Sequence, residues 1–150
     1  MDVGDTAPTF ALTADDGTTV TSADLEGART IVYFYPAAFT PGCTAESCDF
    51  RDNHAAFSAA GYRIIGISPD SAERLADFRK EHDLPFRLLS DPDHAVAEAF
   101  GAWGTKKNYG REYEGLIRST FVIGPDGGIE HAWRNVRAKG HVARVQREVE

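Results

Sequence analysis

Two short segments rich in β-branched and aromatic residues, separated by a stretch of helical length, constrain the fold of this chain most. Residues 31–35 are all β-branched or aromatic, and the run ends at Pro36. Residues 62–68 are rich in isoleucine and are followed by Pro69. Apolar runs of this length are typical of strands buried on both faces of a sheet. The sequence therefore predicts two central strands joined by a helix.

The rest of the chain alternates segments typical of strands and of helices. Asp-Asp-Gly at 15–17 and Pro-Asp-Gly-Gly at 125–128 are turn signals that each separate two short β segments. We expect strands at 10–13, 18–20, 86–89, 119–123 and 129–133, helices at 43–60, 72–82, 91–100 and 140–150, and a long loop at 101–115. This order predicts an α/β fold with a central mixed β-sheet flanked by helices.

The composition fits a single domain over residues 1–150 with a sizeable core, because 42% of the residues are hydrophobic. The formal net charge of −7 argues against nucleic acid or a membrane surface as a partner, since both favour a basic face. The first five residues include two aspartates and no basic residue, so they are not signal-like, and no apolar run approaches the length of a membrane span. We therefore expect a cytoplasmic protein.

Cys43 and Cys48 are the two cysteines of the chain, and they lie near the start of the expected helix. In a reducing compartment, a close pair is more often catalytic, redox-sensing or metal-binding than structural. Cys43 falls in the first helical turn, where unpaired backbone N–H groups and the helix dipole favour a thiolate, the nucleophilic form of cysteine. Two ordinary helical cysteines are the alternative at this point, since cysteine often serves as a small hydrophobe.

Helical geometry separates the two cysteines. Cys43, Phe50 and Phe57 are spaced by seven residues, so they share the core-facing side of the expected helix. Cys48 lies about 140° around the axis, and the two cysteine Cα atoms are about 8.7 Å apart in a regular helix. A disulfide requires less than about 7 Å between these atoms. Either the bond never forms, or the helix unwinds locally to allow it.

The cysteine segment resembles the peroxiredoxins and, within them, the bacterioferritin comigratory protein or PrxQ group. The family pattern of proline, three residues, threonine, two residues and cysteine is met by Pro36, Thr40 and Cys43, and Cys48 stands where the group has its second cysteine. The resemblance to this group extends along nearly the whole chain, through residues 4–8, 65–70, 103–110, 117–121 and 135–142. The resemblance implies a thioredoxin-like fold with an N-terminal β-hairpin extension.

The resemblance also implies a role for each matching residue. Cys43 corresponds to the peroxidatic cysteine and Cys48 to the resolving cysteine. Thr40 corresponds to the threonine whose hydroxyl contacts both the thiolate and the peroxide, and Arg118 to the active-site arginine. Pro36 corresponds to the proline that shields the site.

Taken alone, these residues have plainer interpretations. Arg118 would be an outward-facing strand residue, Thr40 a helix cap and Pro36 the end of a strand. Glu46 matches an acidic position of the family motif, and the sequence assigns it no definite role.

The function that the resemblance implies is a thiol-dependent peroxidase. A Cys43 thiolate attacks hydrogen peroxide or an organic hydroperoxide and becomes a sulfenic acid. Arg118 stabilises the developing charge, and Cys48 closes an intramolecular disulfide with Cys43. Thioredoxin or a similar dithiol reductant then restores both thiols. The resemblance calls for no metal and no organic cofactor, and it favours a monomer.

Two other functions fit the cysteine pair less well. A protein dithiol–disulfide oxidoreductase normally carries Cys-x-x-Cys, whereas four residues separate Cys43 from Cys48. A metal-binding module would need a further ligand besides His54, and none is evident. His54 would also lie about 16 Å along the helix axis from Cys43, too far to act as its base. We expect the other four histidines on the surface.

Overall fold

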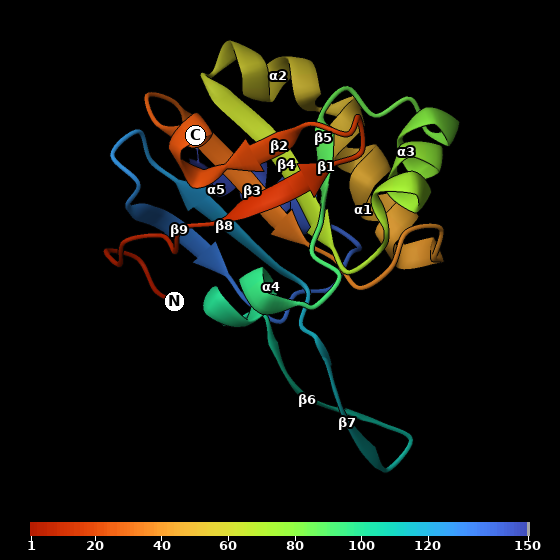
Figure 1. The fold of residues 1–150 in the computed structure, drawn as a ribbon. Coiled ribbons are helices and arrows are strands. Elements are labelled where there is room, and N and C mark those ends of the chain that lie inside the picture. The colour runs from red at the N-terminus through yellow and green to blue at the C-terminus, as the bar shows by residue number, and fades with distance from the viewer. Residues whose placement is uncertain (150) are drawn as a thin grey trace.

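The computed structural model describes residues 1–149 and is built around one mixed sheet of seven strands (Figure 1). The strand order is β2-β1-β5-β4-β3-β8-β9. These strands are β1 (Ala11–Ala14), β2 (Thr19–Thr21), β3 (Arg29–Phe34), β4 (Tyr62–Ser68), β5 (Arg87–Ser90), β8 (Ser119–Ile123) and β9 (Ile129–Trp133). The helices are the 3-10 helix η1 (Ser22–Leu25), α1 (Pro41–Asp52), α2 (His54–Ala59), α3 (Ala72–Glu81), α4 (Ala95–Ala99) and α5 (His141–Val149).

The two predicted buried strands lie side by side at the centre of the sheet. β3 is parallel to β4 and antiparallel to β8, and β4 is parallel to β5. Five of the six residues of β3 are buried, which is why this segment is apolar without alternation. The predicted mixed sheet is confirmed, as are the bounds of β4, β8 and β9.

Alternate side chains of β3 enter two apolar clusters on opposite faces of the sheet. Ile31 and Tyr33 belong to the cluster that α1, α2, α3 and α5 cover. Val32 and Phe34 belong to the cluster that α4, η1 and the N-terminal segment cover. The carboxyl end of β3, which leads into α1, therefore emerges between two packed layers.

The helix predicted over residues 43–60 is wrong in its continuity, because the chain forms two helices that meet at Asn53. The backbone of Asn53 has left the helical region, with φ −107° and ψ 5°. Its side-chain amide donates to the carbonyl oxygen of Asp49 at 2.8 Å, which satisfies a carbonyl at the end of α1. The helix that carries both cysteines thus ends four residues after Cys48.

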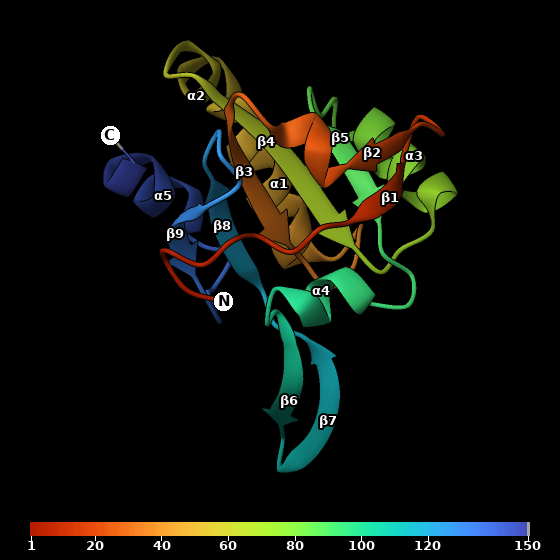
Figure 2. The ribbon, with the colours of Figure 1, turned by 60° about the vertical axis from the view of Figure 1, so that its left-hand side comes forward.

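The loop predicted over residues 101–115 is also wrong, because most of it forms an antiparallel hairpin. Its strands are β6 (Trp103–Asn108) and β7 (Arg111–Leu116), which pair outside the main sheet and project from the body of the molecule (Figure 2). Tyr109 and Gly110 have φ values of 52° and 77°, the left-handed pair that a two-residue hairpin turn requires. The hairpin ends two residues before Arg118.

The remaining expectations need smaller changes. The helix predicted over 91–100 is the single short helix α4, and the predicted C-terminal helix is present as α5, with Glu150 outside the described residues. His141 was expected on the surface, but it is 3% exposed, and its Nε2 lies 2.7 Å from the Thr120 hydroxyl. Within the described residues, no helix is long and apolar enough to cross a membrane.

Candidate active site

Cys43 is the third residue of α1 and is fully buried just beyond the carboxyl end of β3. Thr40 is the N-cap residue, Pro41 opens the helix, and the first helical bond runs from the Thr44 N–H to the Thr40 carbonyl at 2.9 Å. Pro suits this first position because its missing N–H has no partner to lose. The predicted place of Cys43, in the first turn and on the core side, is confirmed.

Arg118 lies beside the Cys43 sulfur, although 75 residues separate the two in sequence. Its Nη2 is 3.2 Å from Sγ, close enough for a hydrogen bond to sulfur. The side chain is 15% exposed, so it points into the molecule rather than outward from the strand. Gly42 borders the guanidinium, because a Cβ at that position would lie 3.4 Å from Nη2, in ordinary van der Waals contact.

Glu46 completes the contacts of the guanidinium from one turn further along α1. Its Oε1 accepts a hydrogen bond from Arg118 Nη1 at 2.6 Å, and its side chain is completely buried. Its Oε2 is buried and has no partner among the described residues. Burial raises the pKa of Glu46 to about 7, against the opposing effect of Arg118. The carboxylate therefore holds the arginine in the orientation that faces the sulfur.

Thr40 and Pro36 frame the entry to this helix. A plain helix cap would accept a backbone N–H of the first turn, but the Thr40 hydroxyl makes no such bond. It donates instead to the carbonyl oxygen of Ala37 at 2.7 Å. Because its proton is committed there, the oxygen keeps its lone pairs for another donor. Pro36 is half-buried and follows the last residues of β3, where it ends the strand.

Cys48 occupies a different setting on the same helix. Both cysteines are unpaired, as the helical geometry predicts, and Cys48 is half-buried while Cys43 is fully buried. Burial raises the pKa of the Cys48 thiol, and the neighbouring carboxylates of Asp49 and Asp52 act in the same direction while Arg51 opposes them. In the folded helix, Cys48 is held as a thiol rather than a thiolate.

The sequence and the structure were compared with those of known proteins. The model of the AhpC/TSA family matches residues 3–132. This chain belongs to the AhpC/TSA family. Peroxiredoxin Bcp of Bacillus subtilis is 48% identical over 145 residues, which cover 97% of this chain and 92% of that protein. Peroxiredoxin Bcp of Escherichia coli is 45% identical over 141 residues, which cover 94% and 90%.

A solved structure extends the likeness to three dimensions. The bacterioferritin comigratory protein of Xanthomonas campestris, studied for its alkyl peroxide reduction activity, superposes with a TM-score of 0.88 at 36% identity, over 93% of this chain and 89% of that one. The chain is thus a peroxiredoxin with a thioredoxin-like fold, as the resemblance implied, and its activity is that of a thiol-dependent peroxidase. The family implies a hydroperoxide substrate and a thioredoxin-like reductant.

Among the described residues, no histidine hydrogen-bonds to Cys43, Glu46 or Arg118 in this peroxiredoxin site. His54 begins α2, beyond the break at Asn53, and so lies on a different helix from Cys43. Burial lowers the pKa of His141 to about 4, with Arg144 and Arg118 acting in the same direction, so this ring is neutral at pH 7. Among residues 1–149, no three histidine, cysteine or carboxylate side chains are grouped to hold a metal ion.

Proposed function

We propose that Cys43 is the thiolate that attacks the hydroperoxide in this peroxidase. The observation that carries the proposal is the 3.2 Å contact between Arg118 Nη2 and the Cys43 sulfur. A permanently charged guanidinium at this distance favours a negatively charged sulfur over a neutral one. No other thiol among the described residues has a cation so placed.

The first half-reaction follows from these groups. The Cys43 thiolate bonds to one oxygen of the hydroperoxide, the O–O bond breaks, and the other oxygen leaves as hydroxide or alkoxide and takes a proton. Arg118 N–H groups stabilise charge on the leaving oxygen, and Thr40 Oγ1 accepts the peroxide O–H because its own proton is committed to Ala37. Pro36 shields the pocket from water. The products are an alcohol or water and a Cys43 sulfenic acid.

The second half-reaction requires α1 to unwind between the cysteines. Cys48 then attacks the Cys43 sulfur as a thiolate, the sulfenic oxygen leaves as water, and a disulfide forms. A dithiol reductant returns two electrons and two protons by thiol–disulfide exchange. The end of α1 at Asp52, four residues past Cys48, limits how much helix has to unwind.

The finer details of substrate, partner and setting are proposals as well. We propose that both hydrogen peroxide and organic hydroperoxides are substrates, in line with the alkyl peroxide reduction of the Xanthomonas campestris relative. Thioredoxin itself, or a close dithiol equivalent, is the proposed reductant. Two unpaired cysteines suit a reducing compartment, so we propose that the protein works in the cytoplasm as a monomer of one domain.

One experiment tests this function directly. Fully reduced protein is mixed with one equivalent of hydrogen peroxide in a stopped-flow instrument, and free thiols are counted at the end. We expect both thiols to disappear orders of magnitude faster than free cysteine reacts at the same pH. A rate like that of free cysteine, with both thiols surviving, would reject the proposal and reopen dithiol exchange as the function.

A further inference from the structure

The short loop between β3 and α1, residues 35–40, carries Thr40 to the site and contains one residue in an unfavourable backbone conformation. Phe39 has φ 67°, in the left-handed region, and its side chain is 41% exposed. For a residue with a Cβ, this conformation is unfavourable, because the Cβ approaches the following carbonyl oxygen. Such a conformation persists only where the surrounding structure holds it in place. The contacts of Ala38, the preceding residue, supply that restraint.

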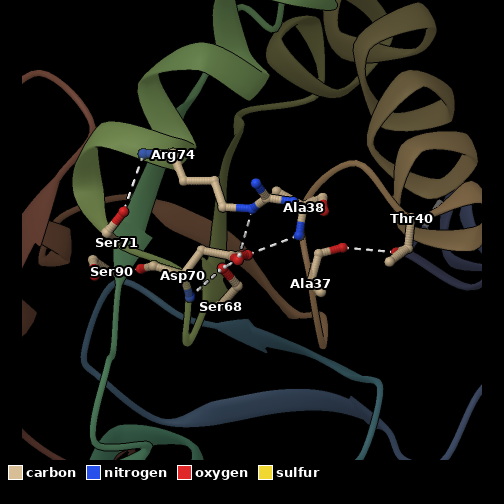
Figure 3. A network of polar contacts seen from close by, with 8 residues as sticks. All are labelled: Ala37, Ala38, Thr40, Ser68, Asp70, Ser71, Arg74 and Ser90. Carbon is tan, nitrogen blue, oxygen red and sulfur yellow. Dashed lines mark hydrogen bonds and ion pairs between the residues drawn. The ribbon is translucent and has the colours of Figure 1, made fainter.

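Asp70, two residues after β4, holds the backbone of this loop. Its Oδ2 accepts the Ala38 N–H at 2.7 Å and the Ser68 hydroxyl at 2.8 Å (Figure 3). The Asp70 side chain is 12% exposed, so water competes little for these bonds. The carboxylate thus ties the loop before α1 to the carboxyl end of the neighbouring strand.

Arg74, in the first turn of α3, contacts the same loop from outside. Its Nε lies 3.4 Å from Asp70 Oδ1, and its Nη2 donates to the Ala38 carbonyl at 3.4 Å. Its guanidinium also lies 5.0 Å from the centre of the Phe39 ring, within range of a cation–π interaction. Asp70 and Arg74 together therefore hold both backbone polar groups of Ala38.

The restraint reaches the reacting residues through a few bonds. The Thr40 hydroxyl donates to the carbonyl of Ala37, the neighbour of Ala38 (Figure 3). The Thr40 carbonyl accepts the first helical bond, from the Thr44 N–H. A shift of Ala38 would therefore move both the Thr40 hydroxyl and the turn that carries Cys43.

We propose that Asp70 is a positioning residue for the peroxide reaction: by fixing Ala38, it keeps Thr40 and Cys43 aligned with Arg118. This inference rests on the proposed role of Cys43. If Asp70 served only to stabilise the fold, its loss would not change how Cys43 discriminates between peroxide and a reagent that needs no alignment.

The test compares two reactions of one thiol. In the full chain with Cys48→Ser, only Cys43 can react, and its rate constants with hydrogen peroxide and with iodoacetamide are measured side by side. Alkylation by iodoacetamide needs an accessible thiolate but neither Thr40 nor the aligned arginine. The matched control is Asp91→Ala, because Asp91 is also a buried carboxylate that follows a central strand and accepts backbone N–H groups, but it holds α4 rather than this loop.

We expect Asp70→Ala to lower the peroxide rate constant by about 10- to 100-fold, the scale on which small misplacements act, with alkylation changed by less than about threefold. Asp70→Asn should lie between, because its amide oxygen can still accept the Ala38 N–H. Asp91→Ala should leave the ratio of the two rate constants unchanged. Arg74→Ala, at a half-exposed side chain that folding tolerates, should lower the peroxide rate constant by a few-fold.

Several outcomes would overturn the inference. One is a ratio of the two rate constants in Asp70→Ala equal to that of the Cys48→Ser parent. Another is the same change of that ratio in Asp91→Ala. If Asp70→Ala fails to fold, a peroxide rate constant in Arg74→Ala equal to that of the parent has the same meaning. A Cys48→Ser parent that reacts with peroxide no faster than free cysteine would instead refute the proposed role of Cys43, so the two failures are distinct.

Discussion

The two cysteines share one helix but have opposite surroundings. Cys43 is fully buried, 3.2 Å from a guanidinium that Glu46 holds in place. Cys48 is half-buried beside Asp49 and Asp52, which together with burial raise its pKa. In the proposed mechanism, the first thiol is prepared in the folded state, whereas the second becomes reactive after the helix opens. Attack and resolution then need different conformations of the same twelve-residue helix.

The largest expected effect comes from removing the prepared thiol. Cys43→Ser should reduce peroxide consumption, coupled to a thioredoxin system, to the uncatalysed background, because a serine hydroxyl is not ionised at neutral pH. Retained turnover in this variant would show that Cys43 is not the thiol that attacks peroxide.

Cys48→Ser should stop the cycle after one turnover. The variant should consume one equivalent of peroxide at nearly the normal rate and then accumulate sulfenic acid, or sulfinic acid in excess peroxide, because no second thiol is at hand. Mass spectrometry of the intact chain measures the added oxygen atoms. Full recycling by thioredoxin would mean that the reductant resolves the sulfenic acid directly.

Arg118→Ala tests whether the cation makes Cys43 the more reactive thiol. We expect the rate constant with peroxide to fall by about 10²–10³, the usual loss when one preorganised charge-stabilising donor is removed. Lys80→Ala, which removes an exposed cation from α3, is the matched control and should react at the wild-type rate. Equal rates for the two variants would remove Arg118 from the mechanism.

Glu46→Gln sharpens the comparison through its pH dependence. The pKa of Glu46 is about 7 in the folded state, so lowering the pH below 7 protonates this carboxylate and weakens its ion pair with Arg118. The rate constant of the wild type with peroxide should therefore fall below pH 7. Glu46→Gln should lack this step. If the wild-type and variant profiles coincide between pH 5 and 8, the titration of Glu46 does not govern the rate.

The titration of Glu46 should affect stability in the opposite direction from activity, because protonation stabilises the folded state. A carboxyl whose pKa rises from 4.5 on folding binds protons more tightly in the folded state. Its contribution to stability is therefore fully present below about pH 4.5 and is lost as the pH rises through about 7. Urea unfolding of the wild type and of Glu46→Gln at several pH values should show this difference.

The smallest effect concerns the neighbours of Cys48. Asp52→Asn removes a charge that raises the pKa of Cys48, so disulfide closure after stoichiometric peroxide should quicken by roughly twofold, as expected for one partly exposed charge. Asp77→Asn, at an exposed position of α3, is the control. A slower closure would show that Asp52 assists resolution in another way.

The sequence predicted those parts of the fold that depend on local pattern. The bounds of β4 and β8 are predicted correctly because each is a compact run of residues suited to buried strands, and those of β9 because the Pro-Asp-Gly-Gly turn places its start. The β6–β7 hairpin was missed because its strands are mostly exposed, charged and interrupted by glycine, so they lack an apolar face. The break at Asn53, where the side-chain amide donates to the Asp49 carbonyl, has no signal in the apolar pattern.

The site shows the same division. The place of Cys43 at the helix start follows from Pro36 to Cys43 alone. The approach of Arg118 could not follow from spacing, since Arg118 lies 75 positions after Cys43, and it is expected only through the family resemblance. The restraint by Asp70 had no local signal at all, because it depends on two strands ending at the same edge of the sheet.

The β6–β7 hairpin has a practical consequence for biosensor construction. Its turn lies at Tyr109, which is 97% exposed, and its second strand leads through Ile117 to Arg118. Exposed turns away from the core tolerate the insertion of whole domains. A fluorescent protein spliced between Tyr109 and Gly110 would leave the seven-stranded sheet intact and stay covalently close to the arginine. Peroxide-driven unwinding of α1 could then be followed as an optical signal in living cells.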